Sequence, residues 1–212
     1  MIIGTLRTAD VSPYLADFTR RAHNRLPDPL RRRIDTLIPA MAGTAGDGLD
    51  NTRADLRADW LIRTAVPMWL DAAGAVEQAT AMRALRAVTC PVSAGAGAVA
   101  LASAVTAAGV RAEVAAAVVP SAVRAAVVEA AEDAVTAAGG GIDSVNAHTA
   151  VAYAAWCVAV EAAQNSSPDM AGRDARAALA PLVGRHLDGV VDLIGRMTRP
   201  ATGRRPDEVP VV

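Results

Sequence analysis

The sequence predicts an all-α protein, a single Ala-rich helical bundle of roughly seven to nine helices with no substantial sheet. Three observations support this class. Residues that start helices, and glycines and prolines that stop them, recur along the chain. Alanine, the residue with the highest helix propensity, dominates the segments between them. The alternation of apolar and polar residues that marks a half-buried strand is absent. Residues 1–6 are the one segment that could form a strand.

The first two helices have the clearest starts. Ser12 suits an N-cap, and Pro13 suits the first helical position because that position needs no backbone N–H donor. Asp28 and Pro29 repeat the arrangement. The second helix carries a core stripe at i, i+4, i+7 and i+8, formed by Leu30, Ile34, Leu37 and Ile38. Pro39 and the Gly-rich segment that follows are expected to end it.

The central helix is expected to begin near Asp50 or Asn51 and to run to about Thr64, with a kink or break at Pro67. A short helix should follow Gly74.

The second half of the chain reads as long Ala/Val-rich helices. One stretch covers 93–138, with interruptions near Gly109 and Pro120, and another helix covers 144–164. The last helix contains Pro181 and is expected to be kinked there.

Length and composition limit the class of protein. A chain of 212 residues is long enough for one domain with a real core, predicted at residues 1–197, and the proline-spaced tail 198–212 is predicted to be disordered. With 21 basic and 22 acidic residues there is no overall field for nucleic acid, so a nucleic-acid partner is not expected. Segment 88–110 is long enough to span a bilayer but is mostly Ala, Gly, Ser and Thr, with one Leu and no Ile or Phe, and no signal sequence is evident. We therefore predict a cytoplasmic protein without a membrane segment.

A ladder of charge crosses the Trp-containing central helix. Asp55, Asp59 and Arg63 follow at four-residue steps and form one narrow stripe between two apolar flanks, which places them at a seam between helices. An acid four residues before a base favours an Asp59–Arg63 ion pair. A second stripe looks like an ordinary solvated face and consists of Arg53, Arg57, Thr64 and Asp71.

Two interpretations of the seam remain open. The favoured one is a structural ion pair, and the other is a ligand site with Arg63 as an anion clamp and tryptophans as walls. His148 lies on the Ala/Val side of its helix, eight residues before Trp156, and a core histidine is favoured over a catalytic one. His23 and His186 look exposed. The ligand-binding candidates are therefore Asp55, Asp59, Trp60, Arg63, His148 and Trp156.

A second pair of carboxylates has the same spacing as the first. Asp188 and Asp192 repeat the D-x-x-x-D of Asp55 and Asp59, although Asp192 is also spaced to pair with Arg196. Two such pairs on facing helices resemble those of squalene/phytoene synthase-like enzymes. That resemblance implies Mg²⁺ held by Asp55, Asp59, Asp188 and Asp192 and presented to a diphosphate.

One segment also resembles a group of uncharacterised Ala/Arg-rich bacterial proteins. The shared pattern is A-D-W-h-h-R-x-x-x-P, where h is apolar, and it matches residues 58–67, including Asp59, Trp60, Arg63 and Pro67. This resemblance implies no particular function.

The sequence thus favours a non-enzymatic helical binding or interaction protein. It would need no cofactor, and its partner would be another protein or a second copy of itself. The alternative is a protein that binds a phosphate or diphosphate at the Asp/Arg seam, or an Mg²⁺-dependent enzyme that uses the paired D-x-x-x-D motifs.

Overall fold

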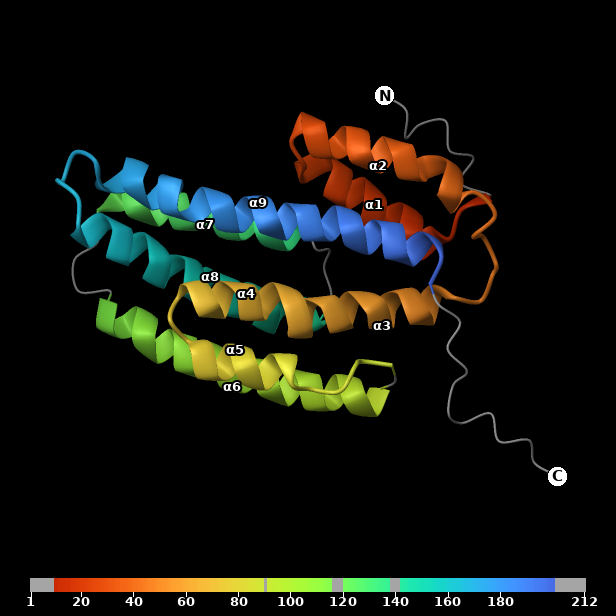
Figure 1. Ribbon diagram of the computed structural model, residues 1–212, viewed down its shortest axis with the longest axis horizontal. Coiled ribbons are helices and arrows are strands. Elements are labelled where there is room, and N and C mark those ends of the chain that lie inside the picture. Colours follow the sequence, from red (N-terminus) through yellow and green to blue (C-terminus); the bar gives the residue numbers. More distant parts are fainter. Residues whose placement is uncertain (1–9, 90, 116–119, 138–141, 201–212) are drawn as a thin grey trace.

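A computed structural model describes residues 10–89, 91–115, 120–137 and 142–200 (Figure 1), and these residues confirm the all-α prediction. They contain no strand, and their helices are α1 (Pro13–Arg25), α2 (Asp28–Met41), α3 (Asp50–Trp60), α4 (Val66–Ala72), α5 (Val76–Arg83), α6 (Pro91–Ala115), α7 (Ser121–Ala137), α8 (Ile142–Gln164) and α9 (Ala171–Thr198). A π-helical turn, Leu61–Ala65, joins α3 to α4. The predictions for residues 1–6 and 201–212 fall outside the described residues.

The helices stack in layers around α8 and α9 (Figure 1). α7 packs beside α9, and α8 packs on α7, α9, α6 and α4. α6 and α5 form the outer layer at the opposite side from α9. The hairpin of α1 and α2 lies on α9, with α1 also touching α7.

Small residues set the distance between these helices. A Cβ built on Gly172 of α9 would lie 2.6 Å from the Ala122 Cβ of α7, and one built on Gly109 of α6 would lie 3.3 Å from the Tyr153 ring of α8. Such contacts show that the helices approach closely where a glycine faces the neighbouring helix, as expected for a core with few large side chains.

The start of α1 is as predicted. Ser12 is the N-cap, and its Oγ accepts a hydrogen bond from the Leu15 N–H at 3.1 Å, while Pro13 occupies the first helical position. α2 runs past Pro39 to Met41, so the helix ends two residues later, before the Gly-rich segment.

The central helix does not break at Pro67. It continues from α3 through the π-helical turn into α4, and the Val66 N–H bonds to the Leu61 carbonyl, five residues back. The wider turn lies just before the proline, where the missing N–H and the ring would otherwise disturb the α-helical pattern. The expected break is therefore absent, and a turn with one extra residue precedes the proline.

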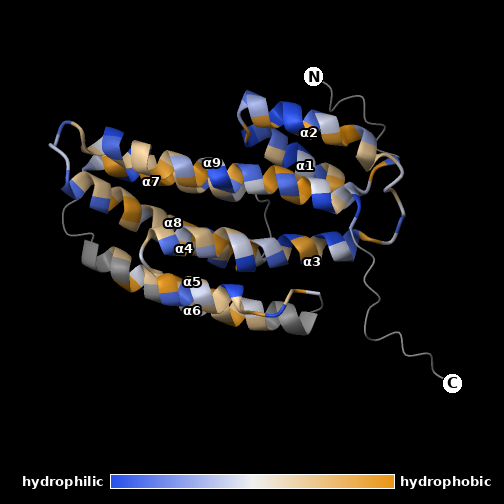
Figure 2. Ribbon diagram, in the orientation of Figure 1, coloured by the Kyte–Doolittle hydropathy of each residue, from blue (hydrophilic) through white to orange (hydrophobic). Residues whose placement is uncertain are grey.

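The long helices run through residues that favour interruptions. α6 continues through Gly109, and α9 continues through Pro181, so both are single helices in the described residues. Tertiary packing outweighs the local preference, since α6 lies against α8 and α9 lies against both α7 and α8. Figure 2 shows α6 and α8 coloured mainly towards the hydrophobic end of the scale. None of the described helices is both long and apolar enough to cross a membrane.

Candidate functional site

The predicted ion pair at the seam is present. Arg63 Nη1 lies 3.1 Å from Asp59 Oδ1, and the same oxygen accepts the backbone N–H of Val88 at 2.9 Å. Asp59 thereby ties the central helix to the segment after α5. The side chains are partly covered, with 22% of Asp59 and 32% of Arg63 exposed. These contacts match the structural interpretation of the seam.

The other candidate residues lie in different surroundings. Asp55 is half-buried on α3, and His148 and Trp156 are half-buried on α8. Within the described part of the chain, no hydrogen bond or ring contact joins His148 or Trp156 to the Asp59–Arg63 pair. Trp60 points instead towards α9. The structure therefore brings together only part of the predicted set.

The second D-x-x-x-D pair is engaged by an arginine. Arg33 of α2 donates to Asp188 at 2.5 Å and to Asp192 at 2.9 Å, so Asp192 pairs with Arg33 instead of Arg196. Across the described ranges, no group of three or more His, Cys, Asp or Glu residues is arranged to hold a metal ion. The geometry gives no support to the diphosphate hypothesis.

The stripe predicted to be solvated contains a buried arginine, which corrects the sequence-based expectation. Arg53 is 0% exposed, donates to Asp47 at 2.5 and 2.9 Å, and bonds Asp50 at 2.9 Å and the Met197 carbonyl at 3.0 Å. Asp50 in turn accepts from the Ser12 hydroxyl. The hydrogen bond from Arg53 holds the pKa of Asp47 below its usual value. This cluster joins the start of α1, the loop before α3 and the end of α9.

His186 is likewise buried, not exposed as the sequence suggested. It is 2% exposed on α9, and its Nδ1 accepts the indole N–H of Trp69 at 3.2 Å. Its ring meets that of Trp60 edge to face, with centroids 5.0 Å apart. Because Nδ1 is an acceptor, the imidazole is neutral with its proton on Nε2. Burial lowers the pKa of His186 to about 4, against a smaller opposing effect of the Ala134 backbone.

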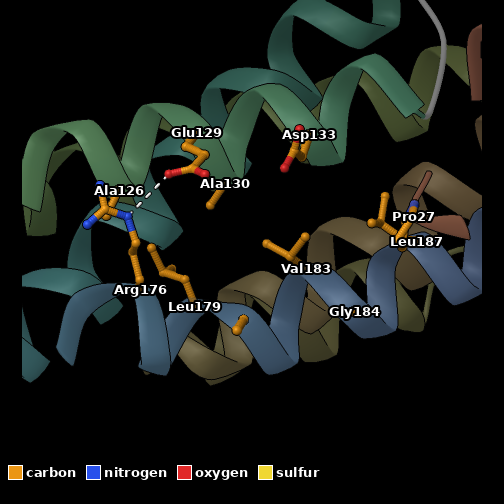
Figure 3. Close-up of a pocket in the computed structure, with 11 residues that line it drawn as sticks. Pro27, Ala126, Glu129, Ala130, Asp133, Arg176, Leu179, Val183, Gly184 and Leu187 are labelled. Carbon is orange, nitrogen blue, oxygen red and sulfur yellow. Dashed lines mark hydrogen bonds and ion pairs between the residues drawn. The ribbon is translucent and has the colours of Figure 1, made fainter. Parts of the chain in front are cut away.

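An open groove lies elsewhere in the protein, where α7 and α9 pack together. A groove with a volume of about 380 Å³ lies between the two helices and is closed at one end by Pro27 (Figure 3). Its lining residues are Pro27, Ala126, Glu129, Ala130, Asp133, Arg176, Leu179, Ala180, Val183, Gly184 and Leu187.

The groove follows from the way α7 and α9 lie together. They run side by side in the same direction, since Gly172 near the start of α9 meets Ala122 near the start of α7. Residues three, four and seven apart on each helix face the same side, and on this side alanines of α7 meet larger apolar residues of α9. Small side chains opposite large ones leave a hollow between the two backbones.

Charged side chains border this apolar hollow. Arg176 Nε lies 3.3 Å from Glu129 Oε2 across the groove (Figure 3). Asp133, one turn further along α7, is half-buried. Burial raises the pKa of Asp133, the charges of Glu129 and Glu132 act in the same direction, and Arg25 acts against them.

Sequence reasoning missed this site because its only local signal is weak. The acids of segment 129–133 fall among alanines and read as an ordinary solvated helix face. The sequence pattern of this segment does not show that α9 packs beside it. Comparison with known proteins adds no further guide, since no family model, curated protein or solved structure matches the chain.

Proposed function

We propose that the protein is a non-enzymatic binding protein that holds a helical segment of a protein partner in the groove between α7 and α9. The observation that carries the proposal is the groove itself, an apolar hollow of about 380 Å³ that is open to solvent and bordered by charge. Hollows of this size and character are where proteins bind their ligands.

The dimensions of the groove suit a helix. Its lining on α9 runs from Arg176 to Leu187, which corresponds to about 16 Å or about three helical turns. The same pair of helices already accepts a helix further along, because α1 packs against both α7 and α9. An amphipathic segment laid in a hydrophobic groove is a recurrent form of peptide recognition.

The chemistry of the lining favours binding over catalysis. None of its residues is a serine, cysteine or histidine, so a serine or cysteine nucleophile with a histidine base is not assembled there. At the Asp/Arg seam, Asp59 already accepts hydrogen bonds from Arg63 and Val88.

A peptide-binding experiment tests this function. The probe is a fluorescein-labelled, uncharged amphipathic helix with leucines at i, i+3, i+4 and i+7, followed by fluorescence anisotropy. We expect binding to the wild-type protein and to Val128→Trp, which alters the exposed side of α7 outside the groove lining. Ala180→Trp, which places an indole in the groove, should abolish binding. Equal binding by both variants, or none by the wild type, would refute the proposal.

A second observation favours self-association, which the sequence also predicted. α6 carries no charged residue over 91–110, lies at the edge of the bundle, and leaves Val99 73% and Val110 58% exposed. We propose that this face meets a second copy of the chain. Sedimentation should show concentration-dependent dimers that Val99→Asp weakens and Val128→Asp does not, and a monomer at every concentration would reject this proposal. The cytoplasmic location stays a prediction.

A further inference from the structure

We infer that the helix bound between α7 and α9 is basic, with an arginine or lysine that pairs with Asp133. This inference rests on the proposed function and specifies the chemistry of its partner. It follows from the distribution of charge around the groove and from the way the chain packs its own first helix.

The α7 wall of the groove has excess negative charge. Glu129 and Asp133 line this wall, the exposed Glu132 lies next to them outside the lining, and Arg176, the cation of the opposite wall, pairs with Glu129. Asp133 forms no hydrogen bond or close ion pair with the part of the chain that the structure describes, and Arg25 is the cation whose charge acts on it. A cation on a bound partner would stabilise the charged form of such an unpaired, half-buried carboxylate.

The first helix of the chain shows what such a partner looks like. α1 packs on α7 and α9 with an apolar face that includes Leu15, Phe18 and Ala22, and it carries Arg25 in its last turn. It starts at the Asp50–Arg53 cluster, beside the end of α9, and runs back towards the groove, where Pro27 closes the near end. An amphipathic basic helix thus already occupies the neighbouring part of this surface, and the charge of its Arg25 acts on Asp133 without forming an ion pair with it.

The partner helix should continue the line of α1. Apolar side chains would contact Leu179, Val183 and Leu187 of α9, while a basic side chain on the α7 side would lie over Asp133. An acidic helix would meet repulsion from Glu129 and Asp133 at the same place. Selection for basic partners is therefore a property of one wall of the groove.

Three peptides separate the charge effect from groove binding itself. They are helices of about 16 residues with the same leucine stripe, and they carry glutamine, arginine or glutamate at the flanking positions. Against the wild-type protein, we expect the arginine peptide to bind about three- to tenfold more tightly than the glutamine peptide, and the glutamate peptide to bind more weakly. The advantage should shrink between about 50 and about 500 mM salt.

Two protein variants locate the effect. Asp133→Asn should remove the advantage of the arginine peptide and leave binding of the glutamine peptide unchanged. Glu132→Gln makes the same change of charge on an exposed residue outside the groove lining, and it should keep most of the advantage. Thermal unfolding checks that both variants are folded. The salt dependence of peptide binding to the wild-type protein measures the contribution of charge without any variant.

The outcomes distinguish the two proposals. If the glutamine peptide binds in the groove but the arginine peptide binds no more tightly, the inference is wrong and the proposed function stands. If the advantage survives in Asp133→Asn, the inference is also wrong. If none of the peptides binds, the proposed function itself fails.

Discussion

Acidification should destabilise this protein through His186. The imidazole lies between Trp60 and Trp69, and its Nδ1 accepts the indole N–H of Trp69 at 3.2 Å. Protonation of Nδ1 would set one N–H donor against another, and it would leave a charge in an apolar core. The folded protein therefore stabilises the neutral ring.

The size of the effect follows from the pKa of His186. That pKa is about 4 in the folded protein, against 6.5 for an unperturbed histidine. At about 1.4 kcal/mol per pH unit, the difference corresponds to about 3 kcal/mol. Because the folded pKa is the lower one, this stability is complete above pH 6.5 and is lost as the pH falls towards 4. About 2 kcal/mol should be lost by pH 5.

Urea unfolding followed by circular dichroism at about pH 7.5 and about pH 5 measures this loss. His186→Gln keeps an acceptor for Trp69 but does not titrate, so its stability should change by about 2 kcal/mol less than that of the wild type over this interval. His148→Gln, a change at a half-buried histidine, is the matched control and should behave as the wild type does. The lowered pKa of Asp47 has its effect below this range. If the wild type and His186→Gln lose equal stability, the assignment to His186 is refuted.

Further predictions concern packing and ion pairs, and unfolding free energies check each of them. Gly172→Ala should cost about 1–3 kcal/mol because its methyl would lie 2.6 Å from the Ala122 Cβ. Gly184→Ala, with no atom within 4 Å of the new methyl, should stabilise by about 0.5–1 kcal/mol, and a loss there would contradict the reasoning. Arg53→Met should cost about 3 kcal/mol or more, since it removes the buried partner of two carboxylates. Arg33→Ala, which breaks exposed ion pairs, should lower the unfolding free energy by about 1 kcal/mol or less. A loss as large as that of Arg53→Met would contradict the view that buried ion pairs matter more than exposed ones.

Local features of this fold are predictable from the sequence. The cap at Ser12 and the Asp59–Arg63 pair depend on residues within four positions of one another, and both are present. The roles of Arg53 and His186 depend on Met197 and Trp69, which are 144 and 117 residues away, respectively, along the chain. Periodicity places a side chain on one side of its own helix and does not say what covers that side.

The groove was beyond prediction for the same reason. Ala126 and Ala130 read as ordinary helix residues until α9 is placed beside them, and the hollow depends on the difference in size between these alanines and the side chains opposite. The seam could be predicted in part, since its main pair is local.

The π-helical turn sets the rotational phase of everything that follows it in the central helix. The turn Leu61–Ala65 holds one residue more than an α-helical turn. Compared with a regular α-helix of the same sequence, the side chains after it are rotated by about 100° about the helix axis. Asp59 precedes this turn, and Trp69 follows it. The turn thus lets one helix direct Asp59 towards Val88 and Trp69 towards His186. Deletion of Thr64 would make a regular α-helix out of this segment, and because it removes the extra residue it should leave Trp69 directed towards His186.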